Sequence, residues 1–227
     1  MAQIKRARTR YAPGAASLEQ IIRAAEHVLV EKGHAALTLR AVADECGLQL
    51  GNLTYYFPTK QALVKALKDS IIAQYARDMA EIELQNPADS KALLKSLMLH
   101  WMRDNYTHRT SRLYVELWSM ANNDPGIRST LNRTAYANSR KRFRAVFKGI
   151  NAELKENELS ALVIFTISML EGIMVLANMD KPDSIYMPML AGYAIQAVLH
   201  LVKNPRETEV AALAARWREL ERVRKLK

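Results

Sequence analysis

The sequence contains few of the residues on which disulfide-stapled, collagen-like and disordered proteins depend. Its 227 residues include only 8 glycines, 7 prolines and 1 cysteine, and 49% of them are hydrophobic. The lone Cys46 cannot form an internal disulfide, so we expect a reducing compartment, with the cytoplasm as the default location. These shortages exclude the three classes above and leave one or two globular domains that bury their own cores.

A long uninterrupted hydrophobic run is also missing. Residues 1–10 carry four basic side chains, but the run of roughly 7 to 15 apolar residues that marks a signal peptide does not follow them. The most apolar stretch, residues 159–179, includes Glu171, and an ionised glutamate in hydrocarbon costs about 2.5 kcal/mol or more. We therefore expect a buried helix there and no membrane partner.

Positive charge is concentrated at the two ends of the chain. The formal net charge is +10; residues 1–10 carry four basic and no acidic groups, and residues 203–227 carry eight basic and four acidic groups. A basic segment without a hydrophobic pattern is typical of a flexible tail that contacts phosphate, although an ordinary solvated tail has the same composition. We expect residues 1–16 to form such an arm.

Apolar residues recur at spacings of three and four almost throughout, which predicts an all-α protein of about ten helices. Thr38 is placed to cap the second helix, and Gly47 suits the left-handed residue that ends it. We expect one domain over residues 17–62 and a larger helical domain over residues 63–227, with the fourth helix bridging the two. The helices are expected over residues 17–33, 38–46, 49–57, 59–85, 88–107, 110–122, 125–150, 157–179, 184–202 and 205–225.

Two short helices joined by a glycine-containing turn, and backed by a longer helix, form the helix-turn-helix pattern. In this pattern the second helix enters the major groove of DNA. Here that helix is residues 49–57, in which Leu53 and Phe57, four residues apart, must face the core. The opposite, exposed face is expected to carry Gln49, Leu50, Gly51, Asn52, Thr54 and Tyr55.

These side chains suit the readout of a duplex. The amides of Gln49 and Asn52 can pair with adenine edges, and Leu50 and the methyl group of Thr54 can contact a thymine methyl. Gly51 lets the backbone approach the groove. Hydroxyl, ammonium and guanidinium groups around the helix suit phosphate oxygens and the flanking strand. This second set is Thr38, Arg40, Tyr55, Tyr56 and Lys60.

At these residues the chain resembles a known family. Residues 38–63, TLRAVADECGLQLGNLTYYFPTKQAL, are similar to the helix-turn-helix signature of TetR-family transcriptional regulators. The likeness covers roughly residues 17–75 and rests on the Gly47 turn, the Gly51-x-Leu53 step, the Tyr55-Tyr56-Phe57 run and the Lys60-x-x-Leu63 start of the next helix. Two positions depart from the family pattern: Thr54 replaces the usual first aromatic residue, and Gln49 replaces the usual small hydroxyl cap.

The resemblance implies a homodimer that binds a palindromic operator, usually as a repressor, and lets go when a small ligand occupies the helical domain. In the family, the penultimate pair of helices forms a four-helix bundle with its two-fold mate, which here implies residues 157–179 and 184–202. The implied base contacts are Arg40, Leu50, Gly51, Asn52 and Thr54, and the implied phosphate contacts are Thr38, Tyr55, Tyr56 and Lys60.

Polar side chains set among apolar ones in the larger domain are candidates for an effector site. Glu116 and Glu171 lie in apolar contexts, and a buried carboxylate must be paired, hydrogen-bonded or protonated. A ligand amine or hydroxyl is one possible partner; the alternative is that each carboxylate pairs with an internal arginine, such as Arg103, Arg109 or Arg112, or faces water. The candidate set is Trp101, Tyr106, Glu116, Trp118, Glu171 and Met174.

Signatures of enzymes and metal sites are absent from the sequence. It has no glycine-rich phosphate loop, no His-Glu-x-x-His pair and no Gly-x-Ser-x-Gly nucleophile, and its five histidines show no ligand spacing. We therefore expect no catalytic residues, no metal and no cofactor. The remaining alternative is a helical protein that binds a partner or a membrane surface without operator specificity, which the basic ends and the amphipathic final helix favour.

Overall fold

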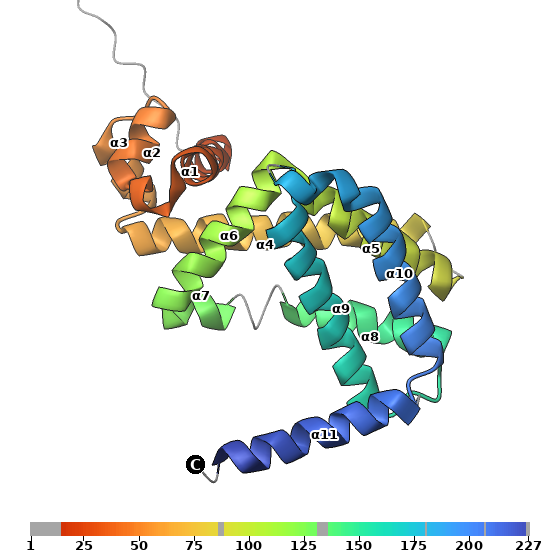
Figure 1. Ribbon diagram of the computed structural model, residues 1–227. Helices are drawn as coiled ribbons and strands as arrows, with labels where there is room; N and C mark the ends of the chain where they lie inside the picture. The colour runs from red at the N-terminus through yellow and green to blue at the C-terminus, as the bar shows by residue number, and fades with distance from the viewer. Residues whose placement is uncertain (1–14, 86–88, 131–135, 180, 207, 226–227) are drawn as a thin grey trace, which may run out of the picture. The chain divides into compact units, whose positions relative to one another are not determined.

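The computed structural model describes residues 15–85, 89–130, 136–179, 181–206 and 208–225. Every regular element in these ranges is helical, with eleven α-helices, one 3-10 helix and no strand (Figure 1). The prediction of an all-α protein is therefore confirmed. Apart from Ala15 and Ala16, the expected basic arm lies outside the described residues.

The chain divides into two compact units, Met1–Ile71 and Ile72–Lys227. The boundary falls inside the long helix α4 (Lys60–Gln85). The sequence pattern predicts the end of the first domain earlier, at residue 62. The first unit contains α1 (Ala15–Ala36), α2 (Leu39–Glu45), α3 (Leu50–Tyr56) and the beginning of α4.

The core of the first unit forms because apolar residues at spacings of three and four share one face of a helix. Gly33 in α1 has φ 77° and ψ 170°, so regular helix geometry is interrupted there. The interruption coincides with the predicted end of the first helix, although helical residues resume as far as Ala36. The buried residues of this unit include Ile21, Ala25, Val28, Leu29, Leu37, Val42, Leu53, Phe57 and Leu63.

Backbone hydrogen bonds build the turn between α2 and α3. The hydroxyl group of Thr38 caps the start of α2. At its end, the Leu48 amide donates to the Ala43 carbonyl at 2.8 Å and the Gly47 amide donates to the Asp44 carbonyl at 3.2 Å. This pair of bonds is a Schellman motif, which requires a left-handed residue. Gly47 supplies that residue at φ 67°, so the predicted roles of Thr38 and Gly47 are both present.

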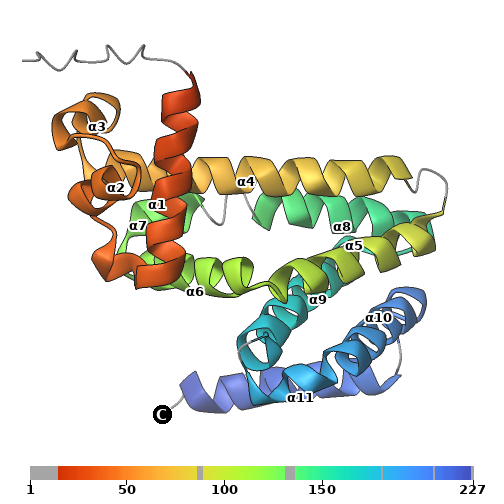
Figure 2. The ribbon, with the colours of Figure 1, turned by 90° about the horizontal axis from the view of Figure 1, so that it is seen from above.

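In the second unit, α5 (Ser90–Asn105) packs against α8 (Tyr136–Ile150), α9 (Glu156–Ala177) and α10 (Met187–Lys203). Figure 2 shows α8 alongside α5, with α9 and α10 next to each other. The other elements are α6 (His108–Asn123), α7 (Pro125–Thr130), the 3-10 helix η2 (Pro182–Tyr186) and α11 (Thr208–Lys225). The single helix expected over residues 125–150 is described as α7 and α8, and residues 131–135 between them lie outside the described part. The core includes Leu94, Leu97, Met98, Phe143, Phe147, Leu170, Val198 and Val202.

Replacing Gly47 by alanine is expected to destabilise the protein by about 1–2 kcal/mol, because a Cβ atom disfavours the left-handed conformation. No atom lies within 4 Å of the added methyl group, so the loss would come from the backbone alone. Gly51 is the matched control: it also has open space around it but lies inside a helix, where alanine is favoured by about 0.5–1 kcal/mol. Chemical denaturation of both variants measures the contrast, and destabilisation of equal size at both positions would contradict it.

Candidate functional site

The exposed face of α3 carries the side chains that the helix-turn-helix pattern predicts. Leu53 and Phe57 are buried, with 0% and 6% of their surfaces exposed, and they hold α3 in the core of the first unit. Tyr55, on the other side, is 78% exposed. The open face consists of Gln49, Leu50, Gly51, Asn52 and Tyr55.

Thr54 and Tyr56 are partly buried, and each has a neighbour within α3. The hydroxyl group of Thr54 donates to the carbonyl of Gly51 at 3.1 Å. The ring of Tyr56 meets that of Tyr55 edge to face, with centroids 5.6 Å apart. Gln49 makes no side-chain bond to the start of α3, so its amide is not consumed by capping and can face a base edge.

Groups suited to phosphate flank α3. Thr38 and Arg40 are exposed at the start of α2. The ammonium group of Lys60, at the start of α4, donates to the backbone carbonyl of His34 at 3.3 Å. An ammonium group has three donors, so this bond holds Lys60 in place and leaves capacity for a phosphate oxygen.

One contact that positions the turn carries no signal in the sequence. The side-chain amide of Gln20, on α1, donates to the carbonyl of Cys46 at 3.2 Å. This bond ties α1 to the turn that leads into α3. Gln20 lies in α1 and Cys46 follows the end of α2, so helical spacing does not connect them. The first unit thus presents amides, an apolar side chain and a cation around one short, well-anchored helix, which suits the major groove of a duplex.

A second set of polar side chains meets inside the second unit. The indole N–H of Trp118, on α6, donates to the hydroxyl oxygen of Tyr136, on α8, at 2.8 Å. That hydroxyl donates in turn to Oε1 of Glu171, on α9, at 3.4 Å. The other carboxylate oxygen, Oε2, is buried and has no hydrogen-bond partner among the described residues. Three helices therefore converge on one carboxylate.

Burial dominates the electrostatics of this cluster. It raises the pKa of Glu171 from 4.5 to about 7, and the hydrogen bond from Tyr136 offsets only part of the rise. Burial also raises the pKa of Tyr75, Tyr114 and Tyr136, and the charge of Glu171 adds to the rise in each. The three hydroxyl groups and the carboxylate therefore lie close enough to interact electrostatically.

Of the six predicted effector residues, Trp118 and Glu171 are brought together by Tyr136. Trp101 packs against Tyr75, with ring centroids 5.4 Å apart and planes at 77°. Because Tyr75 interacts electrostatically with Glu171, Trp101 lies at the edge of the same cluster.

The other three predicted residues are placed differently. Met174 is fully buried, one helical turn from Glu171 on α9. Tyr106 is partly buried against the core of the second unit. Glu116 is partly buried and lies two residues from Trp118, which places it on the opposite side of α6.

Sequence reasoning missed the three tyrosines of the cluster. Tyr75, Tyr114 and Tyr136 come from three separate helices, and a tyrosine at helical spacing is usually plain core. Tyr75 also leaves a buried hydroxyl group without a partner among the described residues. No group of three or more His, Cys, Asp or Glu side chains in the described ranges could hold a metal ion.

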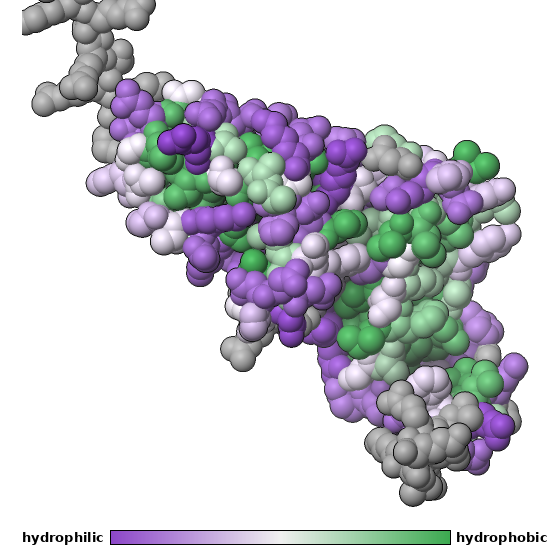
Figure 3. Space-filling model, turned by 60° about the vertical axis from the view of Figure 1, so that its left-hand side comes forward, coloured by the Kyte–Doolittle hydropathy of each residue, from purple (hydrophilic) through white to green (hydrophobic). Residues whose placement is uncertain are grey.

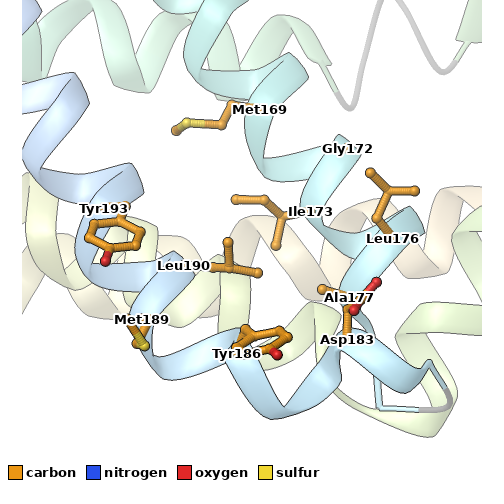
Figure 4. Close-up of a pocket in the computed structure, with 10 residues that line it drawn as sticks. All are labelled: Met169, Gly172, Ile173, Leu176, Ala177, Asp183, Tyr186, Met189, Leu190 and Tyr193. Atoms are coloured by element: carbon orange, nitrogen blue, oxygen red, sulfur yellow. The ribbon is translucent and has the colours of Figure 1, made fainter.

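A third feature is the apolar surface of α9 and α10. Figure 3 shows apolar residues gathered into a patch on this unit. Between the helices lies a groove of about 530 Å³. In Figure 4, Ile173 of α9 and Leu190 of α10 point toward each other across it, and Tyr186 and Tyr193 lie on the same side of the groove as Leu190. The exposed large apolar residues of α9 and α10 include Ile164, Phe165, Val175, Leu176, Met189 and Tyr193.

By length and composition alone, α9 and the segment Pro182–Lys203 could cross a membrane. Only 39% and 33% of their most apolar windows are buried, so much of their apolar surface is not covered by the chain itself. A contiguous exposed apolar patch marks a site of contact with another protein or with a membrane.

Comparison with known proteins identifies the first unit. Residues 21–67 match the family described as bacterial regulatory proteins, tetR family. An uncharacterized helix-turn-helix transcriptional regulator in the dhlA 5′ region of Xanthobacter autotrophicus is 27% identical over 180 residues, which cover 75% of this chain and 83% of that protein. The match thus extends well beyond the helix-turn-helix.

Solved structures share the fold of most of the chain. A transcriptional regulator from Rhodococcus superposes with a TM-score of 0.70 at 18% identity, covering 83% of this chain and 97% of that one. A protein from Saccharomonospora viridis in complex with choline superposes with a TM-score of 0.65 at 17% identity, covering 84% and 97%. At these identities the likeness shows the fold alone.

Glu171→Gln is expected to abolish the part of the pH dependence of the free energy of unfolding that Glu171 causes between pH 5 and pH 8. Folded Glu171 keeps its proton up to about pH 7, whereas the unfolded chain releases it near its ordinary pKa of about 4.3. The folded state therefore binds more protons in this range, and the free energy of unfolding of the wild type falls as the pH rises, by roughly 3 kcal/mol at 1.36 kcal/mol per pKa unit. Urea unfolding of both proteins at pH 5 and pH 8 checks this. Parallel changes in the two proteins would contradict it.

Proposed function

Because the chain belongs to the TetR family of DNA-binding transcriptional regulators, we propose that it is a homodimeric repressor of a palindromic operator. A small-molecule effector that occupies the second unit releases the operator. The observation that carries the proposal is the exposed face of α3, where Asn52 and Tyr55 are open to a duplex while Leu53 and Phe57 anchor the helix.

Each contact on the duplex has a distinct role in this proposal. The amides of Gln49 and Asn52, with Leu50 and Thr54, read base edges. Gly51 permits close approach of the helix. Phosphate oxygens are held by the groups around α3, which position the helix without reading sequence. These groups are Thr38, Arg40, Tyr55, Tyr56 and Lys60.

A second copy of the chain covers the apolar face of α9 and α10. Leu176 is 71% exposed and Tyr193 is 64% exposed, and a two-fold axis would bring the same patch of each copy together as a four-helix bundle. Two-fold symmetry also accounts for the palindrome, because it presents two copies of α3 about 34–36 Å apart, one turn of duplex, or a multiple of that spacing. Dimerisation and operator reading are therefore one proposal.

The effector binds at the cluster around Glu171. A buried carboxylate oxygen without a partner is costly to the free protein, and a ligand that satisfies it would be bound tightly. The residues that we assign to this site are Trp101, Tyr106, Trp118, Glu171 and Met174, with Tyr75, Tyr114 and Tyr136 added by their placement. The sixth predicted residue, Glu116, lies on the opposite side of α6 from Trp118 and is not assigned to it. The choline complex of the structural neighbour from Saccharomonospora viridis is consistent with a small-molecule effector.

Selection of bound fragments from a random duplex pool, at near-physiological salt, tests the proposal. Enrichment of a palindrome is the expected result, and its sequence would identify the operator. Folded, dimeric protein that enriches no duplex, with or without added cell extract as a source of effector, would overturn it. Binding to a partner protein or to lipid vesicles without duplex preference would instead favour the alternative, in which the apolar face of α9 and α10 is the functional surface.

Asn52→Ala and Lys60→Ala are expected to weaken operator binding in different ways. Losing the Asn52 amide should cost on the order of 1–3 kcal/mol and relax one position of each half-site. Losing the Lys60 ammonium should weaken binding to all duplexes alike and lower the salt slope by about one unit per half-site.

Binding titrations on the selected operator and on scrambled duplex, at several salt concentrations, separate the two effects. Lys203→Ala removes an exposed cation from α10 and is the control that should leave the slope unchanged. An unaltered slope for Lys60→Ala, or unchanged specificity for Asn52→Ala, would remove that residue from the interface.

Leu176→Glu is expected to convert the dimer into a monomer, because it places a charge in the middle of the proposed interface. Leu84, on α4, is 81% exposed and lies on a helix outside that interface, so Leu84→Glu is the matched control and should remain dimeric. Analytical ultracentrifugation gives the mass of each variant. A dimeric Leu176→Glu protein would show that another surface joins the two copies.

A further inference from the structure

In the carboxylate of Glu171, one oxygen accepts a hydrogen bond and the other has no partner among the described residues. Tyr136 has a single hydroxyl hydrogen, and it points to Oε1. The oxygen of that hydroxyl accepts from the indole N–H of Trp118. In this Trp118–Tyr136 relay, both donor hydrogens are therefore committed, one to Tyr136 and one to Oε1. The relay fixes the orientation of the carboxylate and cannot serve Oε2, which is buried without a partner in the described part of the chain.

Among the described residues, no basic side chain acts directly on this carboxylate. The influences on the pKa of Glu171 are burial and the Tyr136 hydrogen bond, with no cation among them. Arginines in the same unit act on the tyrosines instead: Arg142 on Tyr75, Arg109 on Tyr114 and Arg140 on Tyr136. Arg142 is itself committed to an ion pair with Glu83. In the described part of the chain, ionised Glu171 therefore lacks an opposite charge in direct contact, and a buried ion in this situation is destabilising.

Aromatic rings make up much of the rest of the cluster. Tyr75, Tyr114 and Tyr136 lie within electrostatic range of Glu171, and the Trp101 ring packs against Tyr75. The faces of such rings carry negative partial charge and attract organic cations. A carboxylate and several ring faces in one buried cluster favour a positive ligand and disfavour an anion, which would meet repulsion from both.

This inference rests on the proposed effector site and gives the ligand its chemical class. We propose that the effector is an organic ammonium ion whose N–H group donates to Oε2 of Glu171 and whose positive charge lies among the tyrosine rings from α4, α6 and α8. The ligand supplies the one hydrogen bond and the one charge that the free protein lacks at this position. An uncharged ligand would leave the carboxylate uncompensated.

Three probes that share a benzyl or phenyl group test the charge requirement on the purified full-length protein. Benzylammonium, benzyl alcohol and benzoate differ mainly in one polar group. Isothermal titration at pH 8, where Glu171 is largely ionised, is expected to show benzylammonium binding at least tenfold more tightly than benzyl alcohol, with benzoate weakest. Equal affinity of the three probes, or no binding by benzylammonium, would overturn the proposal.

A fourth probe tests the hydrogen bond. Benzyltrimethylammonium keeps the charge but has no N–H group to donate to Oε2. We expect it to bind more weakly than benzylammonium. If it binds as tightly or more tightly, the N–H donation to Oε2 is overturned.

Two variants test whether the preference for benzylammonium depends on Glu171. Glu171→Gln keeps the shape of the side chain and removes its charge, so benzylammonium should lose at least tenfold in affinity while benzyl alcohol is unaffected. Glu81→Gln removes an exposed carboxylate from α4 in the same unit and should leave both affinities unchanged. Melting curves confirm that each variant is folded. Retention of ammonium affinity by folded Glu171→Gln would overturn the assignment.

Duplex binding separates this inference from the function on which it rests. Benzylammonium should weaken the complex of the wild-type protein with its selected duplex and have no such effect on Glu171→Gln. A protein that selects a palindrome but ignores ammonium ions would overturn the ligand class alone. A protein that binds ammonium ions through Glu171 but selects no duplex would overturn the repressor and leave the cation site standing.

Discussion

α3 spans seven residues, and isolated helices shorter than about 12–15 residues are marginal in water because nucleation is costly. Its conformation therefore depends on the burial of Leu53 and Phe57 in the core of the first unit. The same burial turns Asn52 and Tyr55 outward, so the exposed face of α3 is a direct consequence of the core. The Schellman turn at Gly47 sets where this helix can begin. A change that loosens the core would therefore disrupt this exposed face without altering any residue on it.

In the first unit the core stabilises the exposed face of α3, whereas in the second unit the proposed ligand site lowers the stability of the free protein. The core of the second unit is apolar over most of its extent, yet it encloses Glu171, whose Oε2 has no partner among the residues described. A buried, unpaired carboxylate oxygen lowers the stability of the free protein, and it gives a ligand of opposite charge something to compensate. The Trp118–Tyr136 relay holds the carboxylate in one orientation, so a ligand would meet a group that is already positioned. The apolar face of α9 and α10 is likewise a surface that the isolated chain leaves uncovered.

Much of the architecture follows from local pattern, because helix formation depends on neighbours three and four residues away. The all-α class, the Thr38 cap, the Gly47 turn and the division of α3 into a buried and an exposed face are all predictable from the printed sequence. The two apolar helices at residues 157–179 and 184–202 are predictable for the same reason. The helix predicted over residues 125–150 is described as α7 and α8, and the residues between them lie outside the described part.

Only the tertiary structure decided which polar groups meet. Glu116 and Glu171 look alike in the sequence, since each is a glutamate in an apolar helix. In the structure Glu171 receives the Trp118–Tyr136 relay, whereas Glu116 lies on the far side of α6 from Trp118. Tyr75, Tyr114 and Tyr136 join the cluster from three helices, and the Gln20–Cys46 bond joins residues 26 positions apart. The sequence alone therefore determined the helices and their faces, because those depend on contacts within one helix. The partners of each buried polar group were decided by how the helices pack, because those contacts join distant parts of the chain.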